Sequence, residues 1–144
     1  MNANSGLSLL QWRGRVLEEF TKTEQAEFEV VLQELRFAEM SGEEARSQAD
    51  IDAAVRARVD GRTIREVLVA GYEHQHRRLM EELTILRGVI SLNVDREPVD
   101  VEAKQRLETH LERQVKRQDA LTGDILRIEA RMVELGAPVA KPLG

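Results

Sequence analysis

The side chains with the most chemical potential lie between Gly71 and Leu79, in the sequence GYEHQHRRL. This segment holds two of the three histidines of the chain, together with Glu73. Glu73 and His76 form a Glu-x-x-His pair, the spacing that di-iron bundle proteins use on two of their helices. Residues three apart share one face of a helix, so a carboxylate and an imidazole at this spacing can bind one metal ion.

Glu73 and His76 would supply only part of such a site. A ferritin-like centre needs a second Glu-x-x-His pair and two further Glu residues. The third histidine, His110, has Leu107 three residues before it, so the sequence holds no second pair. A site for iron or another divalent metal would therefore need a homodimer. The candidate carboxylates for it are Glu27, Glu34 and Asp119.

The helices around this segment favour a structural role for the same residues. From Thr63 to about Asn93, apolar residues recur with alternating gaps of three and four, which is the heptad pattern of helices that pack side by side. A second segment, from about 101 to 136, has the same pattern. Pro98 lies in the short link between them, so we expect the two helices to be antiparallel neighbours. The heptad line of the first is Val69, Tyr72, His76, Leu79, Leu83, Leu86 and Ile90, and that of the second is Leu107, Leu111, Gln114, Gln118, Leu121, Ile125, Ile128, Met132 and Leu135.

A turn centred near residue 97 would place His76 opposite Gln118. His76, Gln114 and Gln118 would then form a buried polar layer between otherwise apolar helix faces. A buried polar group without a hydrogen-bond partner costs about 1–3 kcal/mol, and imidazole and amide groups can satisfy one another. Such layers set the register of paired helices, so this interpretation assigns no catalytic chemistry to the segment.

The remaining segments predict further helices. A short helix begins near Ser8 and carries Trp12, and helical spacing resumes from Thr23, a predicted N-cap, to residue 60. Ser41-Gly42 interrupts this span, which is either one kinked helix or two. The other predicted caps are Thr63 with Glu66, Asp100 and Gly136.

We therefore predict an all-α fold. It is an elongated antiparallel bundle of three long helices and a short N-terminal helix, in which the last two helices form a coiled-coil-like hairpin. The whole chain, 1–144, is expected to be one domain, because 144 residues is an ordinary domain size. We expect the ends, 1–6 and 137–144, to be flexible.

The composition argues against several classes of protein. The sequence contains no Cys, which rules out disulfides, zinc–thiolate sites and thiol nucleophiles. No run approaches 18 apolar residues and the N-terminus lacks a signal-peptide pattern, so we expect a cytoplasmic protein without a membrane partner. The net charge of −5 disfavours nucleic acid, although Arg residues around Asp60-Gly61 leave a DNA-binding helix–turn–helix as a further alternative.

No nucleophile–base pair or glycine-rich phosphate loop occurs in the sequence. The first functional hypothesis is therefore a non-enzymatic interaction or scaffolding protein, without a cofactor, that acts as a helical homo-oligomer or binds another protein. The alternative is a ferritin-like metal-binding or oxidase protein that uses Glu73 and His76 at a subunit interface. Apolar residues away from the heptad lines are the interface candidates: Trp12, Leu68, Met80 and Ile85.

Overall fold

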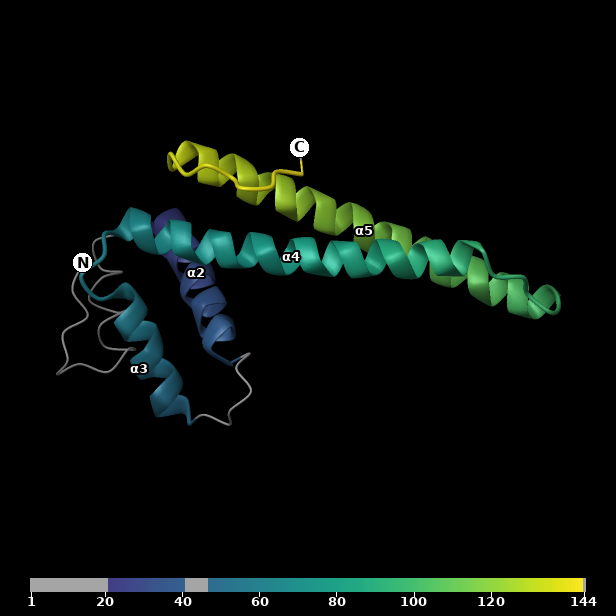
Figure 1. Ribbon diagram of the computed structural model, residues 1–144, viewed down its shortest axis with the longest axis horizontal. Helices are drawn as coiled ribbons and strands as arrows, with labels where there is room; N and C mark the ends of the chain where they lie inside the picture. Colours follow the sequence, from purple (N-terminus) through teal and green to yellow (C-terminus); the bar gives the residue numbers. More distant parts are fainter. Residues whose placement is uncertain (1–20, 41–46, 144) are drawn as a thin grey trace. The chain divides into compact units, whose positions relative to one another are not determined.

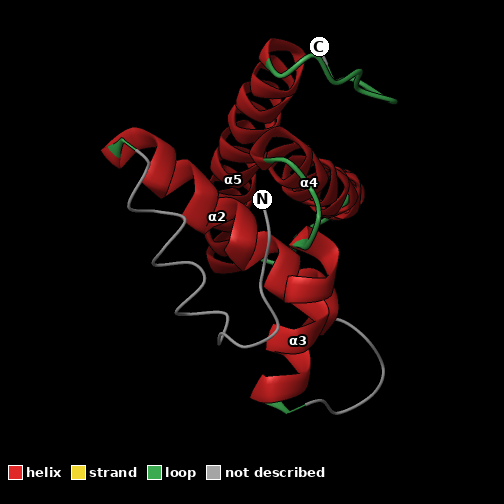
Figure 2. Cartoon of the chain, turned by 90° about the vertical axis from the view of Figure 1, so that its left-hand side faces the viewer, coloured by secondary structure: helices red, strands yellow, loops and turns green. Residues whose placement is uncertain are grey.

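The computed structural model describes residues 21–40 and 47–143. These residues form helices and no strands, which confirms the all-α prediction for this part of the chain (Figure 1, Figure 2). The predicted short helix with Trp12, and the segment 1–6, lie outside the described residues. The four helices are α2 (Lys22–Met40), α3 (Gln48–Val59), α4 (Ile64–Val94) and α5 (Val101–Glu134).

Side-chain caps start α4 and α5 at the predicted places. The backbone N–H of Thr63 donates to the Glu66 carboxylate over 3.0 Å, and the N–H of Glu66 donates to the Thr63 hydroxyl over 3.1 Å. The Asp100 carboxylate accepts from the N–H of Ala103 over 2.7 Å. Each bond satisfies an amide that the first turn of a helix leaves without a partner. These predicted caps are therefore confirmed.

The predicted span 23–60 is two helices. Helix α2 ends at Met40, and Ser47 caps the separate helix α3. The predicted interruption at Ser41-Gly42 lies outside the described residues. The predicted cap at Thr23 is wrong, because Thr21 starts α2 in a reciprocal pair with Glu24. Threonine stands at both positions, and only Thr21 has a Glu three residues later to complete a capping box.

The chain divides into two compact units, Met1–Gln75 and His76–Gly144, and the boundary falls within α4. In the first unit, α2 packs on α3 through apolar residues at helical spacing, and the start of α4 adds to this core. Ion pairs join Arg36 to Asp52 and Arg58 to Glu39 between α2 and α3. The buried apolar residues are Phe28, Val31, Leu32, Leu35, Ile51, Val55, Val59, Val67 and Leu68.

The start of α4 does not follow its predicted heptad line. Val67 and Leu68 are buried, whereas Val69 is half-buried. The reason is that this part of α4 packs with α2 in the first unit, whereas the predicted heptad line assumes that it packs on α5.

Helices α2 and α4 approach one another closely at Gly71. A Cβ atom added there would lie 3.0 Å from the Cβ of Val31 and would collide with its Cγ1. Val31 is buried, and its branched side chain has little rotameric freedom within a helix. A glycine at this position therefore sets how closely the two helices can pack.

In the second unit, the rest of α4 packs closely on α5. Leu79 and Leu83 of α4 are buried, and so are Leu121 and Ile125 of α5. On α5, every position of the predicted heptad line from Leu107 to Leu135 is buried or half-buried. The polar contacts between the helices join His76 to Glu129, Glu82 to Arg117 and Asn93 to Gln114.

These contacts correct the predicted register, because His76 meets Glu129 rather than Gln118. The difference amounts to about three turns of α5. The link between α4 and α5 runs on beyond the end of α4 before α5 begins (Figure 1). An extended residue advances about 3.3 Å, against 1.5 Å in a helix, so a link of this kind displaces α5 much further than a tight turn would.

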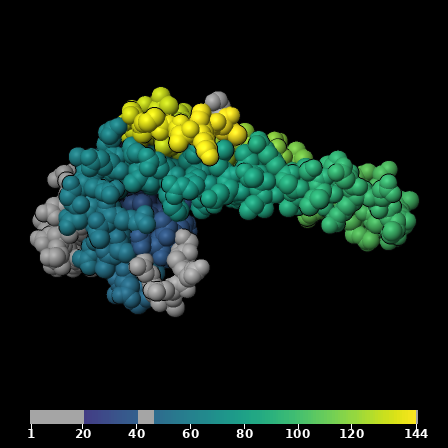
Figure 3. Space-filling view, viewed as in Figure 1, coloured from purple at the N-terminus to yellow at the C-terminus, as the bar shows by residue number. Residues whose placement is uncertain are grey.

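The segment after α5 folds back along it. Gly136 ends the helix with a φ of +74°, in the left-handed region that favours glycine. Ala137 is buried, and the N–H of Leu143 donates to the Glu129 carboxylate. The tail, yellow in Figure 3, lies against the last turns of α5.

No described helix is both long enough and apolar enough to cross a membrane.

Substituting Gly71 by Ala is expected to destabilise the protein. Overpacking a core contact costs about 1–3 kcal/mol, and the better helix propensity of Ala returns about 1 kcal/mol of this. We expect a net loss of up to about 2 kcal/mol in denaturant unfolding. Gly123→Ala is the matched control, because a Cβ there meets nothing within 4 Å and should stabilise α5.

A smaller residue opposite Gly71 should relieve the collision. In a Val31→Ala background, Gly71→Ala is expected to cost less than it does in the original chain. Equal costs in the two backgrounds, or stabilisation by Gly71→Ala alone, would contradict a packing role for this glycine.

Candidate functional site

In the first unit, two polar side chains of α4 hold α2 on either side of Gly71. The Tyr72 hydroxyl donates to Glu27 Oε1 over 2.7 Å, and His74 Nδ1 lies 2.7 Å from Glu34 Oε1. Glu27 precedes Val31 by about one helical turn, and Glu34 follows it by about one turn. The crossing is therefore fixed by close packing at its centre and by a hydrogen bond on each flank.

Glu34 is the buried member of this arrangement. Its exposed fraction is 4%, although the apolar spacing of α2 predicts it away from the core. Burying a carboxylate is costly unless it is hydrogen-bonded, and His74 supplies such a bond. The sequence gives no clear sign of this contact, because Glu34 and His74 are 40 residues apart.

In the second unit, His76 forms the corresponding contact with α5. His76 Nε2 lies 2.9 Å from Glu129 Oε1, and both residues are buried. The same carboxylate oxygen accepts from the N–H of Leu143. Glu129 therefore joins α4, α5 and the C-terminal tail at a single buried atom.

The three residues of the predicted polar layer lie at different levels of the second unit. His76 is buried against Glu129, whereas Gln114 and Gln118 are half-buried. Gln114 Oε1 accepts from Asn93 Nδ2 over 3.0 Å, near the far end of α4. His76 and Gln114 thus each have a partner, but they do not contact one another.

Glu129 and Asn93 are the partners that the sequence analysis missed. A signal for Glu129 exists, because it stands one turn after Ile125 and next to Ile128, beside the apolar line of α5. A charged residue in that position needs either solvent or a buried partner. Deciding between the two requires the register, which the sequence did not supply.

The two residues of the Glu-x-x-His pair differ in exposure to solvent. Glu73 is exposed, whereas His76 is buried and turned to Glu129. Within residues 21–40 and 47–143, no group of three or more His, Asp or Glu side chains is arranged to hold a metal ion. A metal site on Glu73 and His76 stays a prediction that needs ligands from another chain.

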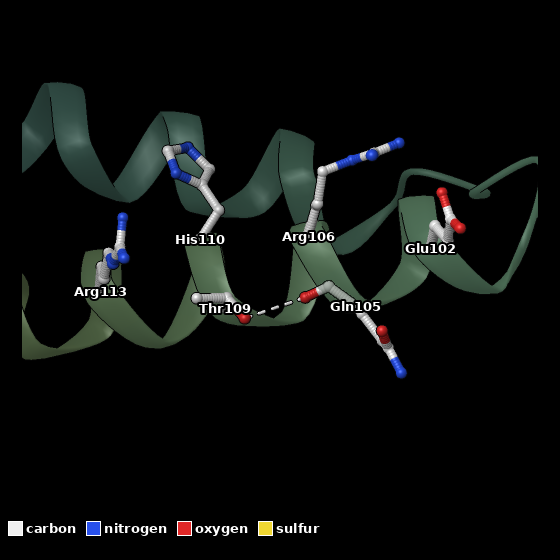
Figure 4. A pocket seen from close by; sticks show the side chains of 6 residues that line it. All are labelled: Glu102, Gln105, Arg106, Thr109, His110 and Arg113. Atoms are coloured by element: carbon white, nitrogen blue, oxygen red, sulfur yellow. Dashed lines mark hydrogen bonds between the residues drawn. The ribbon is translucent and has the colours of Figure 1, made fainter.

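An open cavity lies along the first half of α5. Arg106, His110 and Arg113 follow one another along its wall, and all three are exposed (Figure 4). In the close-up, Thr109 donates its hydroxyl hydrogen to the backbone oxygen of Gln105 on the same helix. The cavity carries no nucleophile–base pair and resembles a solvated basic helix face. The six lining residues are Glu102, Gln105, Arg106, Thr109, His110 and Arg113.

The interface candidates differ in exposure. Leu68 is buried in the first unit and Met80 is half-buried, whereas the exposed fraction of Ile85 is 68%. Trp12 lies outside the described residues. Of the four candidates, Ile85 therefore presents the largest fraction of its surface to solvent among those that the structure describes.

Ile85 belongs to a longer exposed strip that we call the outer stripe of α4, made of Ile85, Gly88, Val89 and Leu92. Leu92 is 71% exposed and Val89 is 38% exposed. Successive members lie three, one and three residues apart, which places them on one side of the helix. Of these four residues, only Ile85 was predicted from the sequence as an interface residue.

Comparisons with known proteins supply no further guide. No family model, no curated protein and no solved structure matches this chain.

A double-mutant cycle should reveal the buried contact between His76 and Glu129. Replacing each by Ala, singly and together, is expected to give a coupling free energy of about 1–3 kcal/mol, because either single change leaves a buried polar partner. The measurement is denaturant unfolding of the four proteins at one concentration.

Glu82 and Arg117 form the matched control on the same two helices. Their contact of 2.6 Å is largely exposed, so its coupling should be below about 1 kcal/mol. If the buried pair showed no more coupling than this exposed one, the structural role given to His76 would be wrong.

Proposed function

We propose that this chain is a non-enzymatic interaction or scaffolding protein that acts as a helical homo-oligomer. The observation that carries the proposal is the exposure of the outer stripe of α4, where Ile85 and Leu92 are 68% and 71% exposed. Single exposed apolar residues are common on protein surfaces, but a continuous strip of them bordered by polar residues is typical of an interaction site.

Apolar exposure continues to the last residue of α4 and into the link. Val94 is 64% exposed, and in the link and at the start of α5 Val99 and Val101 are 93% and 72% exposed. Covering such side chains gains about 25 cal/mol for each Å² removed from water. A second protein surface would remove this exposure without any change in the contacts within the unit.

We propose in addition that α4 and α5 form an antiparallel coiled-coil-like hairpin within a helical bundle. Two observations support this arrangement. The partners of His76, Glu82 and Asn93 have falling residue numbers along α5, and the heptad line of α5 is its least exposed side. A hairpin of this kind would hold the outer stripe on a rigid helix, which lowers the entropic cost of association.

We expect the purified protein to have a concentration-dependent mass that is a multiple of 16.4 kDa in analytical ultracentrifugation. Ile85→Ser with Leu92→Ser should weaken the association by at least about a hundredfold, because each fully buried side chain of this size contributes about 1.5–3 kcal/mol.

The control for this pair is Val133→Ser on α5, which alters an apolar residue that is 66% exposed but lies outside the outer stripe. It should leave the mass unchanged. A protein that stays at 16.4 kDa at every concentration tested would refute the homo-oligomer.

A further inference from the structure

Helix α2 carries a second apolar side, separate from the one that packs in the core of the first unit. Val30, Phe37 and Met40 are exposed by 51%, 43% and 54% respectively. Together with two other exposed residues they repeat with alternating gaps of four and three, the spacing of a helix side that packs on another helix. We call this side the exposed line of α2, and its residues are Ala26, Val30, Gln33, Phe37 and Met40.

A helix with apolar residues on two sides indicates two packing partners. The buried side of α2, which includes Phe28 and Leu35, already packs in the core. A helix at the surface of a unit needs only one apolar side, and the opposite side is normally polar. Within residues 21–40 and 47–143, no element covers the exposed line, since all five of its residues are exposed. A partner for this line would therefore come from outside the described residues.

We propose that the exposed line of α2 is covered by the segment 8–20 of the same chain, running antiparallel to α2. This inference does not depend on the proposed self-association. The segment lies outside the described residues and joins α2 directly, because Phe20 precedes Thr21, the cap of α2. The segment and α2 both fall within the first unit, Met1–Gln75.

The sequence of the segment is that of a helix with one apolar side. At about 100° per residue, its apolar residues fall within about half of the helix circumference. Arg13 is the only charged residue among them, and a long side chain of this kind can lay its methylene groups on apolar surface while its charge stays in water. The apolar residues are Leu9, Leu10, Trp12, Val16, Leu17 and Phe20.

The spacing of the segment mirrors the spacing of the exposed line about Thr21. Two helices that turn back on one another near this residue bring positions equally far from it to about the same level. The pairs equally far from Thr21 are Leu9 with Gln33, Trp12 with Val30, and Val16 with Ala26. From Gln33 to Met40, α2 advances about 10 Å, so a few extended residues before Ser8 are long enough to reach the far end of the line.

The covalent connection favours the segment of the same chain over the segment of a second copy. A short flexible link gives an effective concentration on the order of millimolar, which a free second copy reaches only in a very concentrated solution. The structure thus offers α2 a partner on each apolar side, with the core of the first unit on one and the segment 8–20 on the other.

Trp12 can report on this contact because it is the only Trp in the chain. We expect its fluorescence emission in the native protein to lie at a shorter wavelength than in the unfolded protein, and acrylamide to quench it less, because the indole is removed from water. Val30→Asp would place a charge against the indole, and burying an unpaired charge is unfavourable. This variant should therefore shift the emission toward that of the unfolded protein.

Val133→Asp on α5 is the matched control for Val30→Asp. It makes the same change at an apolar residue that is 66% exposed and belongs to the second unit. It should leave the emission of Trp12 unchanged. Far-UV circular dichroism checks that both variants are folded, which we expect because both residues are exposed.

Disulfide formation tests the register, and the natural sequence has no Cys to interfere. Leu9→Cys with Gln33→Cys should form a disulfide within one chain on mild oxidation. Leu9→Cys with Met40→Cys should not, because residue 40 lies about 10 Å further along α2. Non-reducing electrophoresis distinguishes a single chain closed by a disulfide from two chains linked by one.

Several results would overturn the inference. The first is an emission of Trp12 that Val30→Asp and Val133→Asp affect equally. The second is a disulfide between chains, or an emission that depends on protein concentration, because either would identify a second copy as the occupant. A protein that stays at 16.4 kDa would refute the proposed self-association and leave this inference standing.

Discussion

Helix α4 carries polar side chains into the interior of both compact units, and the packing around it depends on partners for them. Tyr72 and His76 lie one turn apart on one face of the helix, and His74, between them, points to another side. Each finds a carboxylate from another helix, at Glu27, Glu34 and Glu129 respectively. Without these partners, the desolvation of imidazole, hydroxyl and carboxylate groups would oppose folding. The polar segment thus determines where α2 and α5 can contact α4.

One consequence is that the most reactive side chains of the chain are engaged in structural contacts. His76 contacts Glu129, which also receives the N–H of Leu143, and the histidine thereby helps to hold the C-terminal tail. The exposed outer stripe of α4 differs from these buried polar contacts, because it is apolar and charged residues border it. An exposed apolar surface of this kind favours association with another helix, and the proposed function rests on this surface.

Local features were predicted well from the sequence. The caps at Thr63 and Asp100 and the end of α5 at Gly136 each depend on a few neighbouring residues. The cap at Thr23 failed, because a second threonine two positions earlier has the better-placed acidic partner. The heptad line of α5 was also predicted, since amphipathic spacing along one helix is a local property.

The sequence by itself determined that this chain is helical, where the described helices α4 and α5 begin and end, and which side of α5 is apolar. Only the tertiary structure decided the pairings: Glu34 with His74, Glu129 with His76, Asn93 with Gln114, and Val31 over Gly71. The physical reason is that capping and periodicity act within a few residues, whereas register depends on the path of the link between helices. The link between α4 and α5 displaced the partner of His76 by about three turns of α5, and no local pattern encodes such a displacement.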